Sequence, residues 1–136
     1  MATADELRNQ IKQNRDALRE ALQGVKSWED GSDDSWGAKR IAQHVVRSEV
    51  GYANRVSKAM EGKPQDWGDV EFGSSAEALT KEEEAAAMMD KALRYVEDRD
   101  LKKRAEVPGS YSQDVEGAMT ALSAHLAEHA TELKKM

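Results

Sequence analysis

The chain has 136 residues and a formal net charge of −6, and an acidic chain is unsuited to binding nucleic-acid phosphates or anionic membranes. Hydrophobic residues make up 39%, which excludes a disordered chain, and the length is that of a single domain over residues 1–136. Cysteine is absent, which excludes disulfides, a thiol nucleophile and cysteine zinc sites, and fits a reducing cytoplasm. We expect no signal peptide and no membrane-spanning segment.

The first expected helix covers residues 3–26. Its apolar side chains recur at spacings of four, seven and three, which places them on one helical face. They are Leu7, Ile11, Leu18, Leu22 and Val25. Gly24 and the polar run at 29–34 end this helix, and the short connection favours an antiparallel second helix.

The second expected helix covers residues 36–61, with Ser35 as its N-cap and Gly62 and Pro64 at its end. Its inward stripe consists of Ile41, His44, Val45, Ser48, Tyr52, Val56 and Ala59. A long connection at 62–79 follows, and its aromatic residues Trp67 and Phe72 are suited to cover one end of a bundle.

The third expected helix starts at Thr80, because Thr80 and Glu83 form a capping-box pattern, and ends near Arg99. A second connection contains Pro108 and Gly109. The fourth helix runs from about Ser112 to the last residue. Its inward stripe is Val115, Ala118, Met119, Leu122, His125, Leu126, His129 and Leu133.

All three histidines of the chain lie on these inward faces. His125 and His129 are four apart and therefore project from one side of a helix, while His44 lies on the stripe of the second helix. Buried neutral imidazoles need partners. They could each bond a neighbouring core group, but we favour one divalent metal held by all three, an arrangement that leaves an open coordination position as in catalytic sites.

The metal hypothesis makes a prediction about topology. If the second and fourth helices were parallel, His44 and His129 would lie about 20 Å apart. The two helices must therefore be antiparallel, which requires a long crossover between two consecutive parallel helices. The connection at 62–79 can span up to roughly 60 Å, more than the helix length of about 38 Å. We predict an all-α four-helix bundle with up-down-down-up topology and a long crossover between helices 2 and 3.

Two segments resemble a known family. Residues 36–49, WGAKRIAQHVVRSE, are similar to the W-S-x-x-E-x-x-x-H-L-x-x-x-E segment of the DinB/YfiT-like superfamily, although Gly37 and the pair Lys39 and Arg40 depart from it. Residues 122–129 resemble its closing H-x-x-x-H helix. The resemblance implies the same four-helix bundle, a homodimer, and a divalent metal bound by His44, His125 and His129.

Relatives in that superfamily transfer low-molecular-weight thiols, isomerise maleylpyruvate with a thiol cofactor, or hydrolyse amides. The resemblance thus implies a metal-dependent thiol S-transferase or hydrolase that acts on a small molecule, with a low-molecular-weight thiol as a possible second cofactor. Zn²⁺ or Ni²⁺ suits imidazole ligands best. Catalytic residues stay unassigned, since Tyr52, Glu49 and Glu132 are only weak acid or base candidates; Glu132 could instead orient an imidazole.

Two other functions stay open at this point. The first is a non-catalytic metal- or ligand-binding bundle of a stress response, and the second is a metal-free helical dimer. For a dimer, the consecutive residues Ala85 to Met89 cover more than one turn, so some of them must point away from the core. Such a surface suits contact between two copies, or reflects only the helix propensity of alanine.

Overall fold

The computed structural model describes residues 2–32, 34–65 and 71–136. It contains four long helices, α1 (Ala4–Gln23), α2 (Ala38–Ala59), α3 (Ser75–Leu93) and α4 (Val115–Lys134), and a short 3-10 helix, η1 (Asp98–Asp100). Among the described residues there is no strand, only two isolated bridges that join Gly31 to Trp36 and Arg104 to Asp114. None of the helices described is long and apolar enough to cross a membrane.

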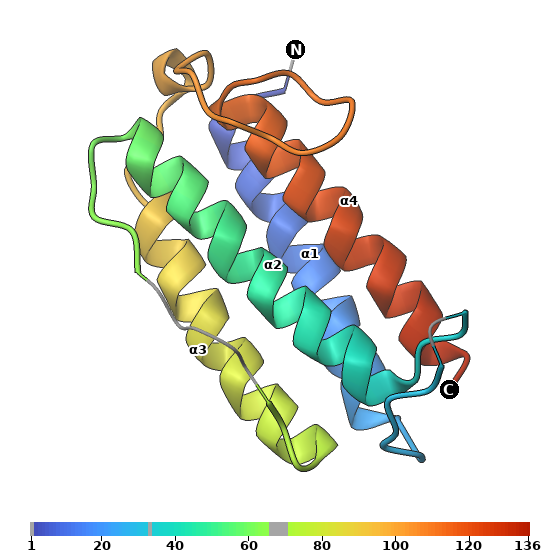
Figure 1. The fold of residues 1–136 in the computed structure, drawn as a ribbon. Coiled ribbons are helices and arrows are strands. Elements are labelled where there is room, and N and C mark those ends of the chain that lie inside the picture. The colour runs from blue at the N-terminus through green and yellow to red at the C-terminus, as the bar shows by residue number, and fades with distance from the viewer. Residues whose placement is uncertain (1, 33, 66–70) are drawn as a thin grey trace.

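The four helices form a bundle with the expected topology. The colour gradient in Figure 1 shows that α1 and α4 run in one direction while α2 and α3 run in the other. Helix α4 packs against α1 and α2, and α3 packs against the same two helices. The up-down-down-up topology is therefore confirmed, and its crossover, residues 60–74, joins the parallel helices α2 and α3.

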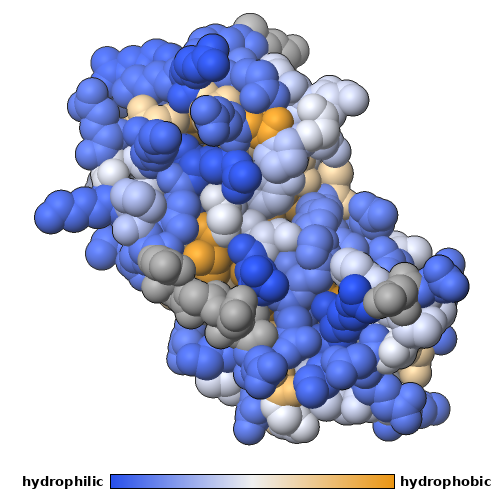
Figure 2. All heavy atoms as spheres, in the orientation of Figure 1, coloured by the Kyte–Doolittle hydropathy of each residue, from blue (hydrophilic) through white to orange (hydrophobic). Residues whose placement is uncertain are grey.

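Each helix contributes one apolar face to a common core. Among the largest fully buried side chains are Leu7, Ile11, Leu18, Leu22, Ile41, Phe72, Met89, Met119, Leu122, Leu126 and Leu133. Burying one such side chain stabilises the fold by about 1.5–3 kcal/mol. Figure 2 shows one side of the molecule as mostly hydrophilic, with small separated apolar areas.

The expected start of the second helix is wrong by two residues. Helix α2 is capped by Gly37, which offers no side-chain hydrogen bond, and Ser35 lies in the preceding loop, where its N–H donates to the Ser32 hydroxyl. This loop is closed by a hydrogen bond from the Gly37 N–H to the Asp30 carbonyl at 2.8 Å. A Cβ atom at position 37 would lie 2.1 Å from the Glu29 carbonyl oxygen. Only glycine fits where the chain turns into α2.

The expected start of the third helix is wrong as well. The hydroxyl of Ser74 caps the Glu77 N–H at 3.2 Å, and the Glu77 carboxylate accepts from the Gly73 N–H at 2.6 Å. Thr80 lies inside α3, and its hydroxyl donates to the Ala76 carbonyl. The pattern of Ser74 and Glu77 thus replaces the expected pair Thr80 and Glu83.

Three further helix ends differ from expectation. Helix α1 ends at Gln23 rather than near residue 26, and α3 ends at Leu93, whose carbonyl accepts from Arg8 at 2.9 Å, rather than near residue 99. Helix α4 begins at Val115 because the Asp114 carboxylate accepts from the Gly117 N–H at 2.8 Å. The expected start at residue 112 was too early.

Candidate metal centre

The antiparallel pair α2 and α4 brings the three histidines together. His44 comes from the first half of α2, and His125 and His129 come from successive turns of α4. The Nε2 atom of His125 lies 3.1 Å from that of His44 and 2.9 Å from that of His129. The potential ligand atoms of all three side chains lie within 4.8 Å of one another. The residues predicted as ligands therefore form one cluster.

Two aromatic side chains flank this cluster. The Trp36 ring stands edge-on to His44, with 5.3 Å between ring centres, and the Arg40 guanidinium lies 4.5 Å from the centre of the Trp36 ring. On the other side, the Tyr52 ring lies 6.3 Å from the His125 ring. Phe72, expected to cover this end, is buried, and its carbonyl accepts from the Trp28 indole at 3.0 Å. Trp67 lies outside the described residues.

Burial keeps the three imidazoles uncharged. Desolvation is the main cause that lowers the pKa of each histidine, and for His125 the neighbouring rings of His129 and His44 lower it further, to about 4. At neutral pH the three rings are therefore neutral, which is the form of histidine that coordinates metals.

The donor set fits a cation better than it fits hydrogen bonds within the cluster. A neutral imidazole has one donor and one acceptor, yet His125 Nε2 faces two other Nε2 atoms. Its Nδ1 atom is buried without a hydrogen-bond partner among the described residues. A metal ion would accept all three Nε2 lone pairs at once. Two ligands on one tetrahedral zinc ion lie about 3.3 Å apart, so only a small opening of the cluster is needed.

The weak acid and base candidates occupy different places. A carboxylate oxygen of Glu132 lies 3.1 Å from His129 Nδ1, although the angle falls short of a hydrogen bond. Tyr52 is buried beside His125, and burial raises the pKa of its hydroxyl. Glu49 is fully buried and binds Arg15. Of the three candidates, Glu132 and Tyr52 accompany the histidines.

A comparison with protein families assigns the chain. The family model described as DinB superfamily matches residues 10–133, a range that includes all three histidines. The chain belongs to the DinB superfamily. Searches of curated proteins and of solved structures found no significant match. The fold, the family and the histidine cluster agree that this DinB protein could hold a metal ion.

A buried charged cluster outside the histidine site was not predicted. Arg15 of α1 donates through Nε and Nη2 to one oxygen of Glu49 in α2, at 2.9 and 2.7 Å. Its Nε also lies 3.9 Å from a carboxylate oxygen of Glu82 in α3. Both glutamates have no exposed surface. The spacing of residues in the sequence could have predicted that Arg15 is buried, because Arg15 lies four residues after Ile11 on the apolar stripe of α1.

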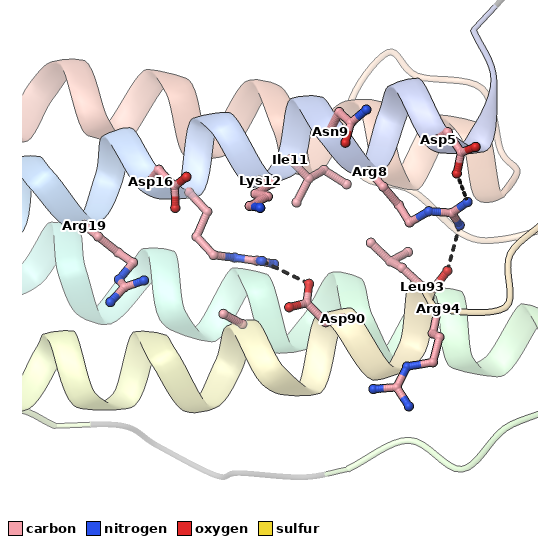
Figure 3. Close-up of a pocket in the computed structure, with 12 residues that line it drawn as sticks. Asp5, Arg8, Asn9, Ile11, Lys12, Asp16, Arg19, Asp90, Leu93 and Arg94 are labelled. Carbon is pink, nitrogen blue, oxygen red and sulfur yellow. Dashed lines mark hydrogen bonds and ion pairs between the residues drawn. The ribbon is translucent and has the colours of Figure 1, made fainter.

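This charged cluster borders a groove of about 670 Å³ between α1 and α3. Figure 3 shows Lys12, Asp16 and Arg19 of α1 across the groove from Asp90 and Arg94 of α3. Arg15 reaches the groove with its third nitrogen and binds Asp90 at 3.1 Å. The cluster therefore joins three helices from the core to the surface.

Proposed function

We propose that this DinB protein is a divalent-metal-dependent enzyme that acts on a small molecule, with His44, His125 and His129 as the metal ligands. The observation that carries the proposal is the convergence of three neutral Nε2 lone pairs on one point between α2 and α4. A divalent ion held by three histidines keeps an open position, at which it lowers the pKa of a water or thiol.

The surrounding residues of the chain serve this chemistry. Burial between two helices holds the proton off the three imidazoles. The Glu132 carboxylate can accept a hydrogen bond from the N–H at His129 Nδ1. This bond would orient His129 Nε2 toward the ion. Trp36 and Tyr52 place aromatic rings next to His44 and His125. Burial raises the pKa of the Tyr52 hydroxyl, whose ring lies 6.3 Å from the His125 ring.

The same proposal includes the identity of the metal, the class of reaction and the oligomeric state. Zn²⁺ or Ni²⁺ is the metal that imidazole ligands favour, and thiol S-transfer or hydrolysis is the reaction class, with a low-molecular-weight thiol as second cofactor. We also propose a homodimer; Ala87 of α3 is exposed and Met88 is partly exposed, which supports a contact surface there.

One observation favours a non-catalytic binding bundle as the second candidate. A hydrolase needs a general base near the bound water. Among the described residues, the Glu49 carboxylate is committed to Arg15, and the Glu132 carboxylate is placed against His129. A screen of thiols with electrophilic acceptors and of amides separates the two candidates, because turnover occurs only with the enzyme.

Metal analysis tests the ligand assignment. The purified protein should retain about one divalent ion per chain after dialysis, and His125→Ala should lose it, because two imidazoles bind far more weakly than three. Gln43→Ala, next to His44 in sequence, is the matched control and should keep the metal. Stoichiometric tight binding by the His125→Ala variant would refute the assignment.

A further inference from the structure

A second groove, of about 860 Å³, lies between the C-terminal half of α2 and residues 103–106. Its charged lining consists of Arg55, Lys58, Lys103, Arg104, Glu61 and Glu106. Cations thus outnumber carboxylates four to two, in a chain whose net charge is −6. Lys103 binds Asp100 at 3.0 Å, but Arg55, Lys58 and Arg104 form no ion pair with any described residue. This groove therefore concentrates uncommitted positive charge.

The groove and the histidine site lie along one stripe of α2. His44, Ser48 and Tyr52 are spaced by four residues and Arg55 follows three residues later, so these side chains share one flank of the helix. The Arg55 guanidinium lies 5.6 Å from the Tyr52 ring centre, and that ring lies 6.3 Å from the His125 ring. The cation therefore stands within about 12 Å of the histidine cluster.

A glycine makes room for the Arg55 side chain on this flank. Gly51 lies one turn before Arg55, and a Cβ atom at position 51 would come within 3.2 Å of an Arg55 terminal nitrogen. The guanidinium thus folds back over the bare backbone and against Tyr52. Asn54 also lines the groove, and its amide group makes two hydrogen bonds to the backbone of Gln65, at 2.6 and 2.8 Å. Helix α2 and the start of the crossover are joined there.

We propose that this groove binds the anionic end, a carboxylate or a phosphate, of the small molecule whose reacting group reaches the three histidines. The inference rests on the metal-dependent function proposed above and names its substrate class. Arg55 is the specificity-determining residue, because a guanidinium pairs with carboxylate or phosphate through two parallel hydrogen bonds. Lys58 and Arg104 add positive potential to the groove.

The test uses the Co²⁺-loaded full chain and two thiol tripeptides. Glutathione carries two carboxylates and its diethyl ester carries none, while both carry the same thiol. Thiolate binding to Co²⁺ gives a near-ultraviolet absorption band whose growth reports the dissociation constant. We expect glutathione to bind about tenfold more tightly than the diester, the effect of one charge-assisted pair.

Two arginine variants make the result specific. Arg55→Gln should weaken glutathione binding about five- to tenfold and leave binding of the diester nearly unchanged. Arg94→Gln, which removes an arginine from the α1/α3 groove, is the matched control and should change neither. Equal binding of the two tripeptides by the unmodified protein, or equal behaviour of the two variants, would overturn the proposal.

Competing anions identify which group the groove prefers. Succinate and inorganic phosphate are each added to the complex with glutathione, and displacement by either one that is weaker in the Arg55→Gln chain than in the unmodified chain supports the groove as an anion site and names its class. Failure of both to displace glutathione overturns the proposal. A protein that shows no Co²⁺ spectrum would refute the metal function instead, and calorimetry with succinate and phosphate on the unmodified and Arg55→Gln chains then tests the groove by itself.

Discussion

The buried charges of Arg15, Glu49 and Glu82 predict a pH-dependent stability. One guanidinium faces two fully buried carboxyl groups, and only one oxygen of Glu49 accepts a hydrogen bond from it. The other Glu49 oxygen and both Glu82 oxygens have no donor among the described residues when both groups are ionised. A proton on Glu82 would supply a hydrogen bond between the two carboxyls. Glu82 is therefore neutral in the folded protein.

The direction of the pKa shift agrees with this assignment. Burial is the largest cause that raises the pKa of Glu82 well above its usual value, and the hydrogen bond and charge of Glu49 raise it further. The cations Arg15 and Arg19 of α1 lower it by less, and Asp90 of α3 faces the same guanidinium. The folded state thus holds a proton that the unfolded chain releases above a pH of about 4.3, so this group's stabilising contribution falls as pH rises.

Two substitutions measure the effect. Glu82→Gln keeps the shape and a hydrogen-bond donor but removes the titration. Its free energy of unfolding relative to the unmodified protein should therefore improve as pH rises from 5 to 8, by about 1.4 kcal/mol for each pH unit over which Glu82 stays neutral in the folded state. Arg15→Met leaves a buried carboxylate without its cation and should cost about 3–5 kcal/mol. That loss is a large part of a typical stability of about 5–15 kcal/mol.

Urea unfolding followed by circular dichroism at pH 5, 6.5 and 8 gives these values. Glu83→Gln is the matched control, because Glu83 is exposed and pairs with Arg19 on the surface, where such a pair contributes at most about 1 kcal/mol. The double variant Arg15→Met with Glu49→Leu should recover much of the loss, because it removes both charges of the buried pair. A Glu82→Gln variant with the same pH dependence as the unmodified protein would refute a neutral Glu82.

Three further results are expected. Because the pKa of His125 is lowered to about 4, protons compete weakly with the metal, and Co²⁺ affinity measured by absorption should change little from pH 7 to 5.5; a steep loss already below pH 6.5 would contradict this. Gly37→Ala should destabilise the protein by more than about 1 kcal/mol in urea unfolding, because its Cβ would overlap the Glu29 carbonyl, whereas Gly24→Ala, which has space, should not. Gly51→Ala should stabilise α2 by about 0.5–1 kcal/mol and weaken glutathione binding about two- to threefold, because it pushes the Arg55 guanidinium aside; unchanged binding would show that the position of Arg55 does not matter.

The topology and the histidine cluster could be predicted from the sequence because they depend on helical period and loop length. The spacing of His125 and His129 and the length of the crossover are local features of the chain. The start of α3 could not be predicted in the same way. Ser74 with Glu77 and Thr80 with Glu83 have the same capping chemistry six residues apart, and the sequence holds no local feature that ranks them.

Buried charge was the other feature that the sequence concealed. Arg15 and Glu82 continue the apolar stripes of their helices, between Ile11 and Leu18 and between Ala78 and Ala85. A charged residue at such a position is usually exposed, and it becomes buried only when a partner from another helix neutralises it. Here the partner is Glu49 of α2, and the pairing of distant helices is a property of the tertiary fold.

Helix α2 supplies both the candidate metal ligand and the buried carboxylate, and it does so from different faces. His44 and Glu49 are five residues apart, which separates them by about 140° around the helix axis. His44 meets α4 through His125, while Glu49 meets α1 through Arg15. The charged cluster can therefore hold α2 in position against α1 and α3 without contact with the histidines. For this reason, loss of metal in a histidine variant that unfolds at the same urea concentration would report on ligation and not on the integrity of the bundle.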